Sequence, residues 1–304
     1  MEIFIEILKS VLFGIVQGIT EWLPISSTGH MILLEEFVSF ENVSENFWQM
    51  FEVVIQFGSI IAVIVIFWDK IFPFSKKGEI LGIMKRDKFF LWLKIALACV
   101  PTAIVGVFFD DQINDLFYNP ITVAVMLIVV GAAFLLVESL NSGRKPKIND
   151  LASISFRTAL FIGLFQTIAA ILPGTSRSGI TILGGLILGV SRTVSAEFTF
   201  FLAIPVMFGA SLLKLMKFGL AFTGTELAVL LTGCVTAFVV SLICIRFLMD
   251  FIKKHDFRVF GWYRIALGAL VLIYGCSTAN AAIVDEVALS ALVPLYGALV
   301  GFSA

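Results

Sequence analysis

Residues 17–30 read QGITEWLPISSTGH, and residues 173–181 read PGTSRSGIT. Each of these polar segments breaks a long apolar stretch near its middle, over residues 3–38 and 155–190. A single membrane-spanning helix is a continuous run of about 20 mostly apolar residues. The two broken stretches therefore differ from ordinary spans, and they decide how the rest of the chain is interpreted.

The composition around these segments is that of an integral membrane protein. Of the 304 residues, 59% are hydrophobic and 14% are charged, and the mean hydropathy is +1.03. Soluble domains carry about 25% charged residues. The formal net charge of −1 offers no basic surface for nucleic acid. We therefore expect an all-α polytopic membrane protein that forms a single domain over residues 1–304 and has no nucleic-acid partner.

Six further apolar runs are long enough to span a bilayer as helices. They lie at about residues 49–68, 89–109, 121–138, 197–217, 225–246 and 260–276. Another run at 284–302, which Pro294 interrupts, is a candidate for an extra C-terminal helix.

The charges of the loops predict an orientation, because Lys and Arg concentrate in cytoplasmic loops. The loops fall into two groups, basic at 69–88, 139–157 and 246–258, and acidic without Lys or Arg at 39–48 and 110–119. With this alternation, each broken stretch enters and leaves on one side of the membrane. We therefore expect two re-entrant helix hairpins, one from each side. Lys214 and Lys217 are the poorest fit to the charge rule.

The two broken stretches also resemble each other. Residues 14–27, GIVQGITEWLPISS, align with residues 163–176, GLFQTIAAILPGTS, which places Ser27 on Ser176. Gly, Gln, Ile, Leu, Pro and Ser recur at equivalent positions. Together with the loop charges, this predicts an inverted-topology repeat, whose broken helices meet near the bilayer midplane. Repeat 1 covers about 3–138, repeat 2 covers about 155–276, and 277–304 is an unmatched tail.

The polar residues of both breaks are candidates for one shared site. Ionisable side chains at membrane depth are costly and usually mark function, which singles out Glu21 and Arg177. Gln17 and Glu21 lie four residues apart on one helix face, and arginine offers a planar fork of donors that suits phosphate. The hydroxyls and glycines nearby are Ser26, Ser27, Thr28, Gly174, Thr175, Ser176, Ser178 and Thr181, and His30 adds a titratable nitrogen.

Plainer interpretations stay open. The Ser- and Thr-rich breaks also suit the caps of two half-helices. His30 also suits a core histidine with satisfied hydrogen bonds, and Glu21 also suits a simple ion pair with Arg177. Inverted repeats with paired hairpins are common in secondary transporters, so a transporter or flippase for a phosphorylated lipid is the alternative function.

These motifs resemble one bacterial family. QGITEWLPISSTGH is similar to the (E/Q)xxxE motif and SSTGH segment of the undecaprenyl-diphosphate phosphatases linked to bacitracin resistance, and PGTSRSGIT is similar to their PGxSRSxxT motif. FEVVIQFGSIIAV and EFTFFLAIP also resemble family segments, in the same order. The resemblance covers about residues 3–276. Gln17 stands where many members have Glu, so it supplies no second anionic metal ligand.

The resemblance implies a phosphatase that removes the terminal phosphate of undecaprenyl diphosphate. The products are undecaprenyl phosphate and inorganic phosphate, and the reaction recycles the lipid carrier of peptidoglycan and other cell-wall polymers. The same resemblance implies six spanning helices with two re-entrant hairpins, a divalent cation, a homodimer, and a multi-pass protein of the bacterial cytoplasmic membrane whose site faces the outer side.

On this basis we expect Glu21, Ser27, His30 and Arg177 to be catalytic. Arg177 would clamp the diphosphate, surrounded by Ser26, Thr28, Gly174, Thr175, Ser176, Ser178 and Thr181. Glu21 and Gln17 would hold Mg²⁺ or Ca²⁺, hard cations that prefer oxygen ligands. Ser27 would be the nucleophile, with His30 as its general base or as the acid for the leaving group. A water activated by His30 or Glu21 would serve as the alternative nucleophile.

Overall fold

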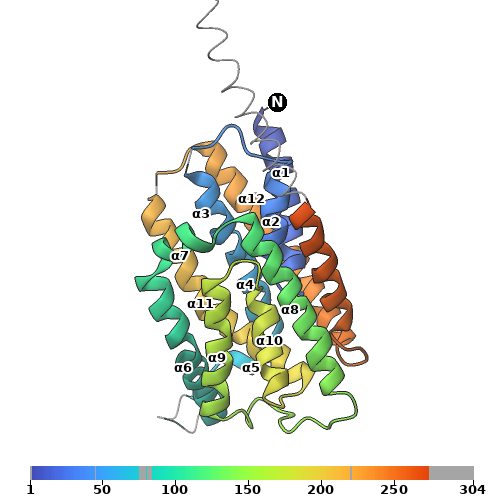
Figure 1. Ribbon diagram of the computed structural model, residues 1–304. Helices are drawn as coiled ribbons and strands as arrows, with labels where there is room; N and C mark the ends of the chain where they lie inside the picture. Colours follow the sequence, from blue (N-terminus) through green and yellow to red (C-terminus); the bar gives the residue numbers. More distant parts are fainter. Residues whose placement is uncertain (1, 45, 75–79, 81–83, 220, 274–304) are drawn as a thin grey trace, which may run out of the picture.

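The computed structural model describes residues 2–44, 46–74, 80, 84–219 and 221–273 of the chain. In this part of the chain every named element is a helix (Figure 1). The helices are α1 (Glu2–Thr20), α2 (Ser27–Glu35), α3 (Phe47–Val54), α4 (Gln56–Ile66), α5 (Trp68–Ile71), α6 (Arg86–Phe108), α7 (Asp110–Phe117), α8 (Pro120–Leu140), α9 (Phe156–Ile171), α10 (Arg177–Ile187), α11 (Arg192–Phe218) and α12 (Gly224–Phe251). A last helical segment covers residues 258–273. The predicted run at 284–302 lies outside the described residues.

Six helices of the described chain are long and apolar enough to cross a membrane: α1, α3 with α4, α6, α8, α11 and α12. Five of them coincide with predicted spans. The two largest differences are at α11, which begins at Arg192 rather than at 197, and at α12, which ends at Phe251 rather than at 246. The side chain of Ser191 caps α11 by accepting from the Val194 N–H, which fixes its early start. The sixth is α1, which was predicted as a hairpin arm, while the predicted span 260–276 extends past the described residues.

The helices around the two polar breaks form two pairs, α1 with α2 and α9 with α10. The 16 residues of α9 rise about 24 Å, which is less than the roughly 30 Å hydrocarbon core of a bilayer. With 11 residues α10 is shorter still, and α2 has 9. These lengths agree with helices that turn back inside the membrane. The re-entrant course of the two hairpins stays a prediction, since α1 by itself is long enough to span.

Each hairpin packs against the other half of the chain. Helix α1 lies along α12, and α9 lies along α6. Helices α4 and α11 lie against α12 and α6 respectively. Glycine allows the close approach: a Cβ at Gly14 would come within 2.6 Å of Thr236, and a Cβ at Gly163 within 2.2 Å of the Ala98 carbonyl oxygen. With α6 and α12 as counterparts, this exchange of arms is what a two-fold repeat predicts.

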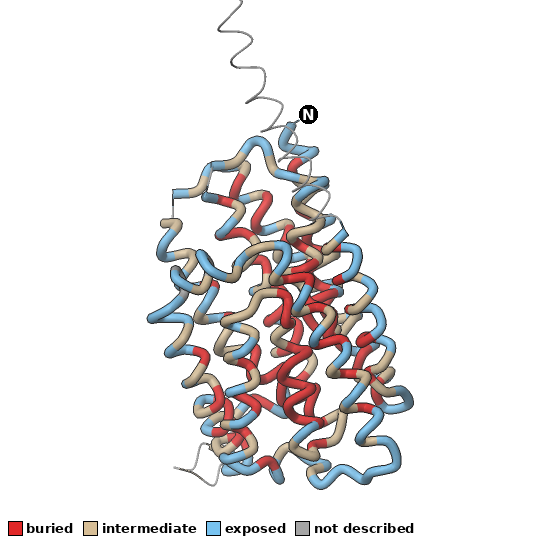
Figure 2. The backbone as a smooth tube through the Cα atoms, in the orientation of Figure 1, coloured by how far each residue is buried: buried red, intermediate tan, exposed pale blue. Residues whose placement is uncertain are grey.

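Buried residues gather along the middle of the helix bundle, and exposed residues lie around them (Figure 2). Many of the exposed residues are large and apolar. Along α12, large apolar side chains that are 49–65% exposed recur every four residues, at Leu231, Val235, Val239, Ile243 and Phe247. A continuous exposed apolar surface marks contact with lipid or with another protein. The stripe therefore agrees with a helix that faces the membrane, and the polar breaks are left in the interior.

Candidate active site

The first polar break begins where α1 ends. Gln17 and Glu21 face the same side, and Gln17 Nε2 donates to Glu21 Oε2 over 2.7 Å. Both side chains are buried, with 1% of Gln17 and 5% of Glu21 exposed. A carboxylate at such depth requires donors around it. The two turns that follow α1 and α9 supply them.

Both turns end in a serine that caps the next helix. Ser26 precedes α2 and accepts from the Gly29 N–H, while Ser176 precedes α10 and accepts from the Gly179 N–H. Their φ angles are 76° and 66°, in the left-handed region that residues other than glycine rarely adopt and that often marks functional sites. The interpretation of the breaks as helix caps is confirmed for these two serines.

The caps correct the predicted alignment of the repeat by one residue. Sequence matching placed Ser27 on Ser176, whereas the structure makes Ser26 the counterpart of Ser176, because both are caps with similar backbone angles. The alignment failed because the second turn has one residue more than the first, PGTS against PIS. The counterpart of Ser27 is therefore Arg177, and each is the first residue of its helix.

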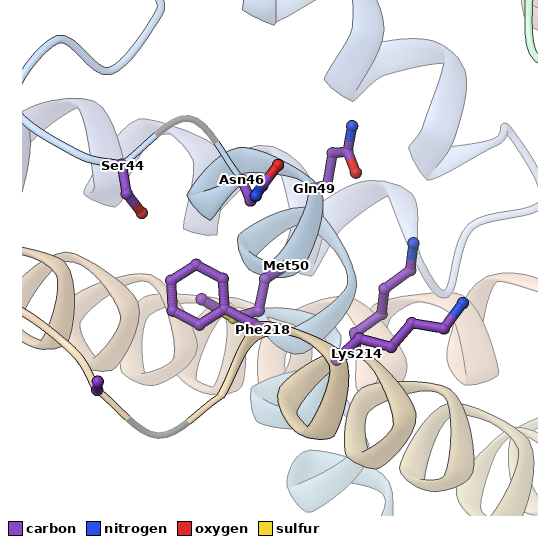
Figure 3. A pocket seen from close by; sticks show the side chains of 8 residues that line it. Ser44, Asn46, Gln49, Met50, Lys214 and Phe218 are labelled. Carbon is purple, nitrogen blue, oxygen red and sulfur yellow. The ribbon is translucent and has the colours of Figure 1, made fainter.

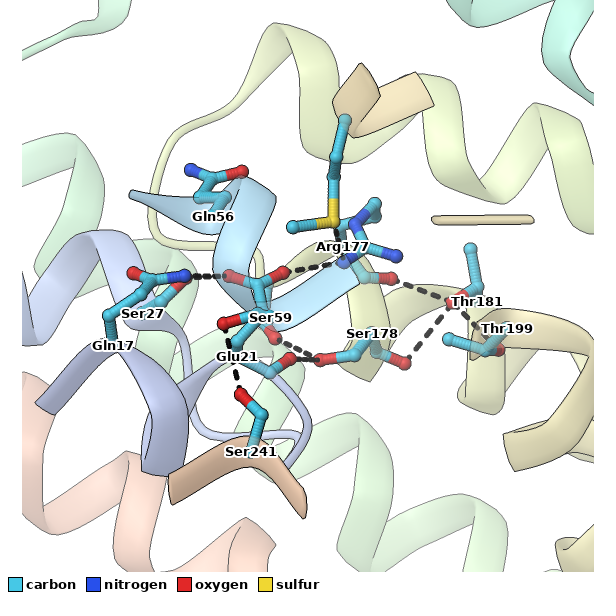
Figure 4. Close-up of polar contacts among 12 residues, drawn as sticks. Gln17, Glu21, Ser27, Gln56, Ser59, Arg177, Ser178, Thr181, Thr199 and Ser241 are labelled. Carbon is cyan, nitrogen blue, oxygen red and sulfur yellow. Dashed lines mark hydrogen bonds and ion pairs between the residues drawn. The ribbon is translucent and has the colours of Figure 1, made fainter. Parts of the chain in front are cut away.

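Ser27 and Arg177 meet on the carboxylate of Glu21 (Figure 4). Ser27 Oγ donates to Oε2 over 2.9 Å, and Arg177 Nη2 donates to Oε1 over 2.5 Å. Arg177 Nη2 also lies 2.9 Å from the sulfur of Met207. The predicted ion pair is thus confirmed, with a serine hydroxyl added to it. One carboxylate joins the two halves of the chain.

Hydroxyls of α10 hold this arrangement in place through the backbone. Ser178 Oγ donates to the Glu21 carbonyl oxygen over 3.0 Å, and Thr181 Oγ1 donates to the Arg177 carbonyl oxygen over 2.7 Å. Thr199 of α11 donates in turn to Thr181 Oγ1 over 2.9 Å. These bonds connect the backbone at Glu21 to α10 and the start of α10 to α11, and so fix the chain segments that carry the carboxylate and the guanidinium.

The carboxylate and the guanidinium line a cavity of about 290 Å³, near the lower end of the volumes usual for ligand sites. Seven predicted site residues form part of its wall: Glu21, Ser27, Thr28, Gly174, Ser176, Arg177 and Ser178. Other helices contribute Gln56, Thr102, Gln166 and Met207. The predicted residues from both breaks therefore surround one space.

The remaining predicted residues lie behind the wall of the cavity. Gln17 bonds Glu21, Ser26 caps α2, and Thr181 bonds the backbone of α10. Thr175 is fully buried, and its Oγ1 donates to the Leu172 carbonyl oxygen over 2.6 Å. The structure gives these side chains bonds that support the site, whereas direct contact with a ligand stays a prediction for them.

Both ring nitrogens of His30 bond groups other than the Ser27 hydroxyl. Its Nδ1 lies 2.7 Å from the Ser26 carbonyl oxygen, so this nitrogen carries the proton, and its Nε2 accepts from the Tyr263 hydroxyl over 2.7 Å. The two rings are stacked with 4° between their planes. Both ring nitrogens are satisfied, as the core-histidine interpretation expects. The acceptor for the Ser27 hydroxyl is Glu21, and the catalytic role of His30 stays a prediction.

Three polar atoms around the cavity are buried without a hydrogen-bond partner: Arg177 Nη1, Gln17 Oε1 and Gln166 Oε1. Leaving such an atom unsatisfied costs about 1–3 kcal/mol, so each calls for an explanation. Arg177 Nη1 is a charged donor and suits an anion. The two amide oxygens are acceptors and suit a cation or a water.

The oxygen donors of this site fit a hard divalent cation. Among the described residues there is no group of three His, Cys, Asp or Glu side chains of the kind that holds a metal by itself. Magnesium, however, is usually held by one or two carboxylates together with waters and substrate phosphates. Glu21 supplies one carboxylate, and Gln17 Oε1 is a buried neutral oxygen without a partner. The residues present therefore suit a cation that is completed by a phosphate ligand.

Ten residues of the cavity wall were not predicted as site residues, and four of them bring polar or sulfur atoms: Gln56, Thr102, Gln166 and Met207. Gln166 carried a usable signal, because the predicted repeat aligned it with Gln17. Its Nε2 donates to Thr102 Oγ1 over 3.2 Å. Thr102 and Met207 lie in apolar helices among residues of similar character, so nothing in the sequence distinguishes them.

A larger cavity of about 500 Å³ lies between α3 and α11 (Figure 3). Its wall includes Gln49, Met50, Lys214 and Lys217. The two lysines lie near the C-terminal end of α11, where the helix dipole favours a cation. The helix dipole thus gives a reason for Lys214 and Lys217 at a helix end that the charge rule predicts to lie outside. The smaller cavity is the better candidate, because a buried ion pair and unsatisfied polar atoms surround it.

Comparisons with known proteins agree on one family. The family described as "Bacitracin resistance protein BacA" matches residues 10–270. The chain is 58% identical over 270 residues to the undecaprenyl-diphosphatase of Desulfitobacterium hafniense, covering 89% of this chain and 96% of the relative. It is 57% identical over 270 residues to undecaprenyl-diphosphatase 1 of Clostridium acetobutylicum and to an undecaprenyl-diphosphatase of Enterococcus faecalis, with 89% of this chain and 97% of each relative covered.

Proposed function

The chain belongs to the bacitracin resistance protein BacA family, and from this premise we propose that it hydrolyses undecaprenyl diphosphate to undecaprenyl phosphate and inorganic phosphate. The protein is a multi-pass membrane phosphatase. The reaction recycles the lipid carrier of peptidoglycan and other cell-wall polymers and confers bacitracin resistance. Relatives that are 57–58% identical over most of their length and carry the name of this phosphatase support the assignment.

The observation that carries the assignment to this cavity is the joint hold of Ser27 and Arg177 on Glu21. Phosphoryl transfer needs a positioned nucleophile and donors that stabilise the charge of the transferred group. Ser27 offers the first, and the free Nη1 of Arg177 offers the second. The N-termini of α2 and α10 adjoin the same cavity and add backbone N–H groups suited to phosphate.

In the proposed reaction, Ser27 Oγ attacks the terminal phosphorus. The bond between Ser27 Oγ and phosphorus forms while the bridging P–O bond breaks, and undecaprenyl phosphate leaves with the electron pair. Glu21 Oε2 already accepts the Ser27 hydroxyl, so this carboxylate takes the proton. A water then hydrolyses the phosphoserine. Arg177 and Ser176 hold the oxygens of the transferred group.

A water activated by Glu21 or His30 is the alternative nucleophile that fits the same residues. The two versions differ in whether a covalent intermediate forms. Rapid acid quenching during turnover, followed by mass spectrometry, would detect phosphate on Ser27 in the first version. Ser27→Ala with near-normal turnover would end that version and leave the water.

For the cofactor we propose a divalent cation, Mg²⁺ or Ca²⁺, held by Glu21 and Gln17. Gln17 offers Oε1, which has no other partner, and Glu21 offers a carboxylate oxygen. When bound, such a cation neutralises part of the negative charge of the diphosphate. Gln17 meanwhile orients Glu21 through the 2.7 Å hydrogen bond, with or without the cation.

The membrane placement that we propose is the cytoplasmic membrane of a bacterium, with the site facing the outer side and two copies in a homodimer. The alternation of basic and acidic loops supports the orientation. We also propose that residues 3–138 and 155–276 are inverted repeats, which the exchange of α1 and α9 between the two halves supports. A flippase for a phosphorylated lipid, the alternative from the fold alone, is not favoured, because it requires no hydroxyl on a carboxylate.

The test is phosphate release from a C55 prenyl diphosphate by the purified protein in detergent. We expect release that EDTA abolishes and added Mg²⁺ or Ca²⁺ restores. Glu21→Ala and Arg177→Ala should each abolish it, because the two residues belong to opposite turns of one site. A folded, monodisperse wild-type sample that releases no phosphate with any metal tried would favour lipid transport instead.

A further inference from the structure

Arg264, on the last helix, bonds the turns of both hairpins. Its Nη2 donates to the carbonyl oxygens of Gly174 and Thr175, each over 2.9 Å, and its Nη1 donates to the Pro24 carbonyl oxygen over 3.3 Å. The side chain is fully buried, at 0% exposed. Nη2 also lies 3.4 Å from the carbonyl oxygen of Met126 on α8. One guanidinium therefore connects the two breaks of the chain from a third segment.

These bonds lie next to the two serine caps. Pro24 is two residues before Ser26, and Thr175 directly precedes Ser176. Both serines have left-handed backbones, a conformation that persists only where the surroundings impose it. The planar guanidinium donates in several fixed directions at once, which the single ammonium of lysine cannot copy. Arg264 is thus placed to set the spacing between the helix starts that carry Ser27 and Arg177.

The charge of Arg264 is also unusual. Arg177 pairs with Glu21, and Arg192 pairs with Glu138. Among the described residues, no carboxylate lies within ion-pair distance of Arg264, whose hydrogen-bond partners are all backbone carbonyl oxygens. An arginine that is buried without a counter-ion is costly, so it calls for a compensating role.

The cavity gives that charge a use. Glu21 and Arg177 cancel each other, so without a bound cation their pair contributes no net charge to a site that has to hold a diphosphate anion. Gly174 lines the cavity, and its carbonyl oxygen is bonded by Arg264. The guanidinium of Arg264 therefore lies directly behind the cavity wall, where charges interact more strongly than in water.

We propose that Arg264 is a positioning residue of this site, which holds the two turns at their working distance and adds a fixed positive charge behind the cavity for the diphosphate. This rests on the phosphatase function proposed above. The two parts of the role are separable, because lysine keeps the charge without the fork, and glutamine keeps a donor without the charge.

The experiment measures kcat, KM for a C55 prenyl diphosphate, and the Ki of inorganic pyrophosphate, in detergent. Arg264→Gln should raise KM and Ki by about tenfold or more, since a factor of ten corresponds to only 1.4 kcal/mol of lost attraction. Arg264→Lys should keep Ki within about threefold of wild type but lower kcat by at least about tenfold, because small misplacements of reacting groups have large effects on rate.

The controls are Arg192→Gln and Arg192→Lys, which alter an arginine paired with Glu138 and outside the cavity wall. Both should keep wild-type Ki and KM. If Arg264→Gln does not stay monodisperse, Arg264→Lys alone decides. A wild-type kcat in Arg264→Lys overturns the proposal. So does a fall in kcat that comes with an equal rise in Ki. A wild-type protein that releases no phosphate would instead refute the proposed function, so the two failures are distinguishable.

Discussion

The turns that end at Ser26 and Ser176 have the same backbone geometry, but the side chains that follow them differ in chemistry. In each, a serine with a positive φ caps a short helix and accepts from a glycine N–H three residues on. The next residue is Ser27 in one turn and Arg177 in the other. The shared backbone geometry directs two different side chains at the same carboxylate, so a difference at one position per segment is enough to place a hydroxyl and a guanidinium on Glu21. Substitutions at Glu21, at Arg177 and at the two caps would show whether the two turns differ in function.

The largest expected effect is at Glu21, where the two turns meet. Glu21→Gln removes the acceptor of the Ser27 proton and the partner of Arg177, so kcat should fall by about 10³-fold. The matched control is Glu197→Gln, which alters a buried carboxylate paired with Lys70 over 2.6 Å and outside the cavity wall. Steady-state phosphate release measures both. A fall in kcat of less than tenfold for Glu21→Gln would mean that the two turns do not act through this carboxylate.

The next effect distinguishes the arginine turn from a merely positive one. Arg177→Lys keeps the charge but loses the fork that reaches both Glu21 and a phosphate, so we expect kcat to fall by about 10²-fold. Arg192→Lys, which alters the pair with Glu138, should keep its rate. An Arg177→Lys enzyme with wild-type kcat would mean that charge alone suffices in the second turn.

A smaller effect tests whether the two caps are equivalent. Ser26→Ala and Ser176→Ala each remove a cap and keep a side chain at a positive φ, so each should destabilise the protein by about 1 kcal/mol. Ser26→Gly and Ser176→Gly should be milder, because glycine adopts this conformation freely. Thermal unfolding in detergent measures all four. If alanine is tolerated better than glycine in one turn alone, the two backbone geometries are not the same.

The smallest effect concerns the amides that flank the turns, Gln17 and Gln166. Gln17→Glu adds a second carboxylate beside Glu21, so the Mg²⁺ concentration for half-maximal activity should fall by about fivefold, as ligand charge raises affinity for such cations. Gln166→Glu, at the aligned position of the second repeat, should leave it unchanged. A metal titration of phosphate release measures both. Equal shifts in the two variants would place the cation between the repeats.

Much of the fold was predictable because the bilayer constrains it strongly. Runs of about 20 apolar residues gave five of the six helices that are long enough to span the membrane, and two motifs marked both turns. The arms of the first hairpin were harder, since α1 is as apolar as a span. Its 19-residue length became visible only once the helix end at Thr20 was known.

Most residues of the site were predicted from the sequence, but the alignment of the two repeats was wrong by one residue. Glu21, Ser27 and Arg177 stood out because polar groups are rare at membrane depth. One extra residue in the second turn misaligned Ser27 with Ser176, and backbone angles alone reveal that error. Arg264 carried the same signal, because it is an arginine within the predicted span 260–276. Its place beside the site was not predictable, since its partners are backbone carbonyl oxygens that no side-chain pattern encodes. Contacts between segments that are distant in the chain cannot be predicted from local sequence patterns.

The contact between Arg264 and Pro24 joins residues 240 positions apart in the chain, and α1 lies along α12. A ribosome therefore adds Arg264 to the chain 240 residues after Pro24. During insertion of the nascent chain, Glu21 enters the bilayer before Arg177, and both enter before the helical segment 258–273. The parts of the cavity are therefore together only after the segment with Arg264 has entered the membrane.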